Sequence, residues 1–178
     1  MNANLQGHQS KVADPLDSFV EPNFIDLLCG LDHCAVIDFF FYFSRFEHAL
    51  KIKRFICTDK SGQYVVGVDW HAFIRTLPNN YPSGSEKVDN AIRYICNYPV
   101  KRQKTDLTWV ARSAITPPCF KMALNEVPKI RNNIFHGGKY LRPNKVRDEA
   151  LLINSTILIK TCLQNDPDLY QQFIYTGK

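Results

Sequence analysis

The stretch Phe120–Lys139, FKMALNEVPKIRNNIFHGGK, carries the pattern on which the fold prediction rests. Its apolar residues recur at spacings of three and four, which places them on one face of a helix. Gly137 and Gly138 follow where a helix would end in a left-handed cap, so His136 is expected in the last turn or at the cap. We therefore predict one helix here and expect it to be the central helix of the fold. The apolar stripe consists of Phe120, Ala123, Leu124, Val127, Ile130 and Ile134.

Arg131 falls inside this apolar stripe, about 40° around the helix from Val127. An arginine keeps its charge, so an arginine on an apolar face needs a carboxylate or an anionic ligand. Arg131 and His136 leave a regular helix about 140° apart, so one helix alone does not aim them at a common point. A long arginine side chain, an unwound helix end or a second copy of the helix could bring them together. Asn132 shares a face with His136.

A purely structural interpretation of these residues is also open. A histidine at a helix C-terminus suits the helix dipole, and an arginine can extend from the core to water along its alkyl chain. Glu47 is the best candidate partner for Arg131, because a half-buried arginine needs a carboxylate or a phosphate.

Helical periods dominate the rest of the chain, and no alternating strand series appears. We predict an all-α class, a bundle of four or five main helices with short extra helices. The long helix expected after Asp32 is apolar nearly all round at Val36–Phe43, which indicates burial against the core and against a dimer partner. Residues 1–18 are predicted to be a flexible arm, and 19–178 one domain. The other expected helices cover residues 22–28, 70–77, a segment opened by a Ser83–Glu86 capping box, 106–115, 144–163 and a segment after Asp166, with a loop or short hairpin at 58–67.

Composition sets the limits on function. The formal charge of +5 and a pI near 8.9 are compatible with an anionic partner. No stretch is apolar enough for a membrane span, and the polar start of the chain lacks a signal core, so we expect a cytoplasmic protein with reduced cysteines. Cys29, His33 and Cys34 lie close together, but no second Cys/His pair has zinc-site spacing, so neither a metal nor a cofactor is predicted. Phosphate-binding loops, dinucleotide fingerprints and serine-hydrolase elbows are absent from the sequence.

A compact basic cluster, Lys101, Arg102 and Lys104, stands beside Tyr98. It could bind a nucleic-acid backbone, and a solvated loop is the other interpretation.

The combination of Arg131, Asn132 and His136 resembles the R-x4-6-H motif of HEPN domains, and the run Phe135–Lys139 continues the likeness. A second segment, Phe43–Lys51, resembles the first long helix of many HEPN proteins. The resemblance implies a HEPN-like helical fold and a homodimer in which both motifs face one groove. It also implies a metal-independent endoribonuclease with His136 as acid/base, Arg131 as phosphate clamp and Asn132 as orienting group, supported by Glu47 and Lys139.

The resemblance further implies a growth-inhibiting toxin or an antiphage effector, with an antitoxin or other regulatory protein as a possible partner. The chemistry suits the residues, because a histidine of near-neutral pKa can move the protons of RNA strand cleavage and an arginine can hold the phosphate. The alternative is a HEPN module that binds nucleotides or RNA, or only dimerises, without cleaving. A third reading is a helical scaffold in which the arginine is structural.

Overall fold

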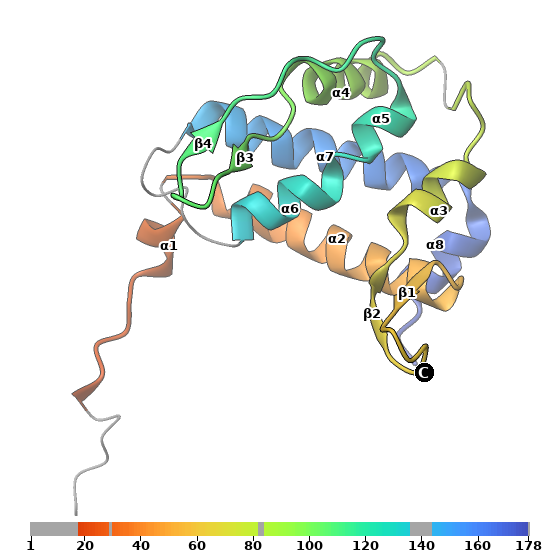
Figure 1. Ribbon diagram of the computed structural model, residues 1–178, viewed down its shortest axis with the longest axis horizontal. Coiled ribbons are helices and arrows are strands. Elements are labelled where there is room, and N and C mark those ends of the chain that lie inside the picture. Colours follow the sequence, from red (N-terminus) through yellow and green to blue (C-terminus); the bar gives the residue numbers. More distant parts are fainter. Residues whose placement is uncertain (1–17, 29, 82–83, 136–143, 178) are drawn as a thin grey trace, which may run out of the picture.

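A computed structural model describes residues 18–28, 30–81, 84–135 and 144–177. These residues form a mostly helical fold with two small antiparallel sheets of two strands each, so the predicted helical class is confirmed at this level. Figure 1 shows the arrangement of the elements. In chain order they are α1 (Phe24–Leu27), α2 (His33–Ile52), β1 (Ile56–Thr58), β2 (Val65–Val68), α3 (Trp70–Thr76), α4 (Glu86–Asn97), β3 (Arg102–Gln103), β4 (Trp109–Val110), α5 (Phe120–Leu124), α6 (Val127–Phe135), α7 (Lys145–Asn165) and α8 (Pro167–Ile174).

The centre of the fold is α7, which packs against α2, α4, α5, α6 and α8 (Figure 1). The expectation that the stretch 120–139 forms the central helix is therefore wrong. Helix α7 is buried on most sides. Its buried hydroxyl groups form hydrogen bonds to the backbone of the preceding turn: Ser155 donates to the carbonyl of Leu151, and Thr156 to that of Leu152. Such bonds to the preceding turn allow polar residues to sit in an apolar interior.

The caps of the long helices explain where they begin. The carboxylate of Asp32 accepts a hydrogen bond from the backbone of Cys34, and the amide oxygen of Asn144 accepts one from Arg147. Asp69 and Asp166 cap α3 and α8 in the same way. The predicted helices at these positions are confirmed. The capping-box prediction is wrong, because α4 begins after Ser85, whose side chain makes no capping hydrogen bond; Ser83 lies outside the described residues.

The amphipathic pattern of α4 shows how the core is assembled. Its buried residues are the apolar set that recurs at spacings of three and four, and this face packs on α5 and α7. A second anchor is aromatic: the ring of Phe46 on α2 contacts Trp70 and Phe73 on α3. The buried residues of α4 are Val88, Ala91, Ile92, Ile95 and Cys96.

The predicted single helix over 120–139 is divided into α5 and α6. Pro128 explains the division, because proline has no N–H to give and its ring collides with the carbonyl one turn earlier in a continuous helix. In the second position of α6 the missing donor costs nothing. The chain turns at Asn125 and Glu126, and the carbonyl of Glu126 accepts the first hydrogen bond of α6 from Ile130. The apolar stripe still faces the core, because both short helices keep it on their buried side.

The predicted helix over 106–115 is also wrong: residues 106–110 form the turn and second strand of the hairpin β3–β4, and residues 111–115 have no helical structure. Asp106 turns the chain by accepting hydrogen bonds from the backbone and the hydroxyl of Thr108, and Leu107 has a left-handed backbone with φ of 64°. Trp109 and Val110, which favour extended backbone, then form the second strand. The hairpin expected near 58–67 is confirmed as β1–β2.

Cysteine placement is mixed: Cys96 and Cys162 are buried, Cys119 is half-buried, and Cys34 and Cys57 are exposed. Burial raises the pKa of the Cys96 and Cys162 thiols. In the described part of the chain, none of the helices combines the length and the apolar character that a membrane crossing requires. The predicted arm covers residues 1–18, of which 1–17 lie outside the described residues.

Candidate RNA interface

Helix α6 carries two of the predicted site residues. Arg131 is half-buried and Asn132 is exposed. The guanidinium donates from Nη1 to the amide oxygen of Asn132 at 3.1 Å. It also lies over the ring of Phe43 on α2, 5.8 Å from the ring centroid, a distance at which a cation and an aromatic face attract each other. The arginine therefore rests on an aromatic surface rather than on a carboxylate.

Glu47 does not make the predicted contact with Arg131. Its carboxylate accepts a hydrogen bond of 3.1 Å from the indole nitrogen of Trp70, and the two rings of Trp70 and Phe43 stack at 5.6 Å. The reason is the amphipathic character of tryptophan: the N–H of the buried Trp70 indole needs an acceptor, and Glu47 supplies it from the neighbouring helix. Glu47 thus supports the aromatic surface beneath Arg131 indirectly, and leaves the guanidinium without a carboxylate within 4 Å among the described residues.

The predicted basic cluster lies on the hairpin that follows α4. Arg102 belongs to β3, and Lys101 and Lys104 flank this strand; all three side chains are exposed. The hairpin is attached to α6, since the side-chain amide of Asn133 on this helix donates to the backbone carbonyl of Lys101 at 2.7 Å. The structure therefore connects the basic cluster directly to the helix of Arg131 and Asn132.

Arg147 holds the other end of the same segment. From the first turn of α7 its guanidinium donates to the carbonyls of Tyr98 and Pro99, at 3.2 and 2.9 Å, and to the buried carboxylate of Asp148 at 3.3 Å. Neither Arg147 nor Asn133 is among the residues predicted from the sequence. The positioning role of Asn133 has no sequence signal, because its partner is a backbone carbonyl that any residue would offer.

A buried ion cluster lies at the opposite end of α6. Glu126 is only 1% exposed, and its two carboxylate oxygens accept from Arg112 at 2.6 Å and from Lys129 at 2.7 Å. A buried carboxylate needs such partners, because an unpaired charge in the interior is very costly. This ion cluster is not among the features predicted from the sequence either, although an acidic residue inside an apolar stripe is a usable signal.

His136 and Lys139, the remaining predicted site residues, lie outside the described residues, as do Gly137 and Gly138. Cys29 of the suggested metal corner also lies outside them. Asp32, His33 and Cys34 stand close together at the start of α2, and all three are exposed.

The described part of the candidate site therefore combines an arginine on an aromatic surface, an exposed amide and three exposed cations on a tethered hairpin. Such a surface can hold phosphate groups, since guanidinium and ammonium groups make charge-assisted hydrogen bonds to phosphate oxygens. Comparisons of the chain with protein-family models, with curated proteins and with solved structures find no match.

Proposed function

We propose that this protein is a metal-independent endoribonuclease of the HEPN type, which cleaves RNA by attack of its own 2′-hydroxyl. The observation that carries the proposal is the bond from Asn133 to Lys101, which places an exposed basic hairpin beside the helix of Arg131 and Asn132. A phosphate backbone lying on the hairpin would pass along α6, whose last described residue, Phe135, directly precedes His136.

The proposed reaction follows from the residue types. The 2′-oxygen attacks phosphorus while the bond from phosphorus to the 5′-oxygen breaks, and the proton of the 2′-hydroxyl ends on the 5′-oxygen. His136 would accept or donate that proton, because imidazole titrates near neutral pH. Arg131 would stabilise the charge that develops on the phosphate oxygens. The guanidinium lies over Phe43, and among the described residues no carboxylate within 4 Å competes for this role.

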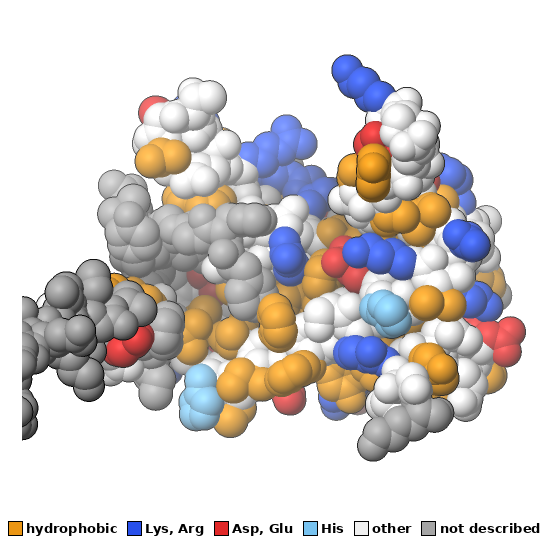
Figure 2. Space-filling model, turned by 90° about the horizontal axis from the view of Figure 1, so that it is seen from below, with side chains coloured by type: hydrophobic (Ala, Val, Ile, Leu, Met, Phe, Trp, Pro, Cys, Tyr) orange, Lys and Arg blue, Asp and Glu red, His pale blue; other side chains and the backbone are white. Residues whose placement is uncertain are grey.

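We further propose that the active form is a homodimer. Helix α2 exposes Ile37, Phe40 and Phe41, which are 48%, 49% and 59% exposed, and hydrophobic side chains gather on the face that Figure 2 presents. An apolar group of this kind is typical of a protein interface. Arg131 and His136 of one chain leave a regular helix in different directions. A second copy would bring its own Arg131 and His136 to the same groove, so that an arginine from one chain and a histidine from the other could act on one phosphate. Light scattering at micromolar concentration should give twice the 20.5 kDa mass of one chain; a monomer would contradict the dimer.

The test of the activity is cleavage of defined RNA by the purified protein in the presence of EDTA. We expect products with 2′,3′-cyclic phosphate and 5′-hydroxyl ends, and no cleavage of DNA or of RNA with a single 2′-deoxy group at the cut site. His136→Ala, purified in the same way, should cleave about 10²- to 10⁴-fold more slowly, the range for loss of a general acid or base. Equal cleavage by both proteins would identify a contaminating nuclease and contradict the proposal.

A second candidate is a module that binds RNA without cleaving it. The arrangement of Arg131 favours it, because the guanidinium is already engaged with Asn132 and the Phe43 ring. This candidate predicts that wild-type protein and His136→Ala bind single-stranded RNA with equal affinity in a fluorescence-anisotropy titration and that neither cuts it. A toxin or antiphage role requires RNA cleavage, so it depends on the first candidate.

A further inference from the structure

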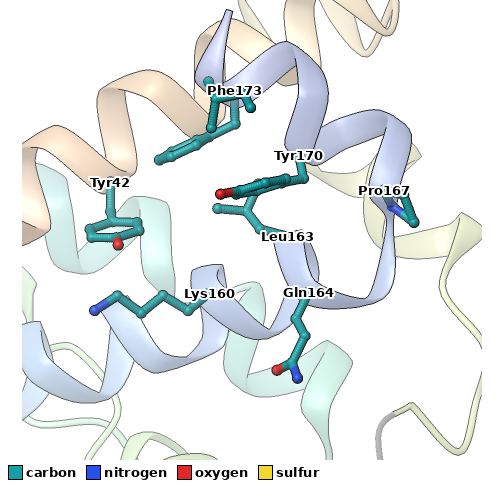
Figure 3. Close-up of a pocket in the computed structure, with 8 residues that line it drawn as sticks. Tyr42, Lys160, Leu163, Gln164, Pro167, Tyr170 and Phe173 are labelled. Carbon is teal, nitrogen blue, oxygen red and sulfur yellow. The ribbon is translucent and has the colours of Figure 1, made fainter.

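A hollow of about 440 Å³ lies between α2, α7 and α8 (Figure 3). Its volume falls in the range of small-molecule sites, roughly 300 to 1,000 Å³. None of its lining residues belongs to the candidate RNA interface. It is lined by Tyr42, Lys160, Leu163, Gln164, Pro167, Tyr170, Phe173 and Ile174.

Three aromatic rings form its apolar walls. Phe173 stacks near-parallel with Tyr42, at 5.5 Å and 22°, and with Tyr170, at 6.5 Å and 15°. Figure 3 shows the three rings around the hollow, with the hydroxyl of Tyr170 pointing into it. Flat, near-parallel aromatic surfaces favour a planar ring as a guest, because offset stacking is their preferred contact.

Arg45 on α2 holds one wall of the hollow. Its guanidinium donates to the backbone carbonyl of Phe173 from both Nε and Nη2, at 2.9 and 2.6 Å, and also to the carbonyl of Tyr175. A planar guanidinium that bonds to two carbonyls, two residues apart, fixes the end of α8 on α2. The hollow is therefore built before a ligand arrives, which lowers the entropy cost of binding.

Lys160 supplies one positive charge at the rim. Its ammonium lies 4.5 Å from the centroid of the Tyr42 ring, and in the described part of the chain no carboxylate comes within 4 Å of it. The acidic residues of the neighbouring turn are occupied: Asp166 caps α8 through Leu169, and Asp168 pairs with Lys53. An exposed cation–π contact is weaker than a charge-assisted hydrogen bond, so an acidic oxygen would draw the ammonium from the ring.

We propose that this hollow binds a small molecule with one flat aromatic ring and one acidic group. The ring lies against Tyr42, Tyr170 and Phe173, and the acid binds the ammonium of Lys160. Gln164, one turn further along the same face of α7, offers an amide at the rim. An aromatic carboxylate and a nucleoside monophosphate share this chemistry. The inference stands apart from RNA cleavage, because it uses none of the residues assigned to cleavage.

Isothermal titration at low ionic strength tests the site with four probes. 2-Naphthoate and adenosine 5′-monophosphate carry the charge, and 2-naphthamide and adenosine are their neutral counterparts. We expect at least one charged probe to bind with a dissociation constant below roughly 1 mM and about tenfold more tightly than its neutral counterpart. The pair that shows this margin identifies the source of the acid, carboxylate or phosphate.

Variants then locate the binding. Lys160→Met should abolish the margin between charged and neutral probes, Lys160→Arg should retain it, and Lys87→Met, the same change at an exposed lysine of α4, should match wild type. Tyr170→Ala removes a ring that is 44% exposed, so the fold should survive while the charged and neutral probes both bind more weakly.

Three results would overturn the proposal: no charged probe binding below roughly 1 mM, an unchanged margin in Lys160→Met, or unchanged binding in Tyr170→Ala. Circular dichroism of each variant confirms that a loss of binding is not a loss of fold.

Discussion

The start and the middle of helix α6 carry charges in different surroundings. At its start, Glu126 is buried and both of its oxygens are bound by the cations Arg112 and Lys129. In its middle, Arg131 is half-buried against Phe43 and has an amide, not a carboxylate, as its hydrogen-bond partner among the described residues. The first charge is neutralised within the fold, so its role is to hold the chain together. The second has no such neutralising partner in the described part of the chain, which is why we propose that it binds an anionic ligand. A charged residue in an apolar stripe is thus not by itself a sign of function; its partners decide.

The largest effect is expected at Arg131. In Arg131→Ala the rate of RNA cleavage should fall about 10²- to 10³-fold, as for other groups that stabilise a developing negative charge. The free energy of unfolding should change little, because no buried ion pair is broken. Arg131→Lys keeps the charge but loses the planar fork, so it should recover only part of the rate. The measurements are single-turnover cleavage and urea unfolding. A large loss of stability in Arg131→Ala, with normal cleavage by the folded fraction, would assign Arg131 a structural role like that of Glu126.

The opposite result is expected at the start of the helix. Glu126→Gln leaves two cations without their carboxylate and should lower the free energy of unfolding by about 2–3 kcal/mol. This is less than the ~3–5 kcal/mol for breaking a fully buried pair, because Arg112 and Lys129 can still reach water. Urea unfolding measures the loss. Glu86→Gln, the same change at an exposed carboxylate in the first turn of α4, should cost no more than about 0.5 kcal/mol. Equal losses in the two variants would show that the Glu126 carboxylate contributes no more stability than an exposed one.

The sequence was sufficient for the elements whose signal is local. Asp32 and Asn144 indicate the starts of the two longest helices, because the side chain of an N-cap residue bonds to a backbone N–H within three residues. Pro128 is also a local signal for a break between two helices. The apolar stripe continues across it, however, and therefore favoured one continuous helix. The helix predicted over 106–115 does not form, because the turn at its start depends on one carboxylate, that of Asp106, and on a left-handed Leu107.

The site divides along the same line. That Arg131 is charged and lies in an apolar stripe follows from spacing, whereas its aromatic support on Phe43 depends on how α6 crosses α2. Spacing likewise could not show that Trp70 takes the carboxylate of Glu47, since these residues belong to different helices. Contacts between elements are set by packing, and a single sequence carries no direct record of them.

A smaller effect is expected from the basic hairpin. Replacing Lys101, Arg102 and Lys104 together by alanine should weaken RNA binding and reduce the dependence of the binding constant on salt, by about 2 in the slope of log K against log salt for single strands. Cleavage at saturating RNA should fall much less than in Arg131→Ala, because these cations hold the backbone and do not contact the reacting phosphate.

The matched control replaces three exposed basic residues elsewhere, Lys51, Arg75 and Lys87, by alanine. It removes the same net charge and should leave the salt slope nearly unchanged. Identical slopes for the two triple variants would mean that RNA is attracted by the net charge of the whole protein and not by the hairpin.

The smallest effect concerns the turn that presents these cations. Hydrogen bonds from the hydroxyl and the backbone of Thr108 lower the pKa of the Asp106 carboxyl below its ordinary value of 3.8. A carboxyl whose pKa is lower in the folded state stabilises the fold above its unfolded pKa, and this contribution is lost as the pH falls through the folded value. In an NMR titration the Thr108 amide should therefore shift with a midpoint below 3.8, and the shift should vanish in Asp106→Asn. A midpoint at or above the ordinary value would show that the Asp106 turn does not form in solution. The hairpin could then not be what positions the basic cluster beside α6.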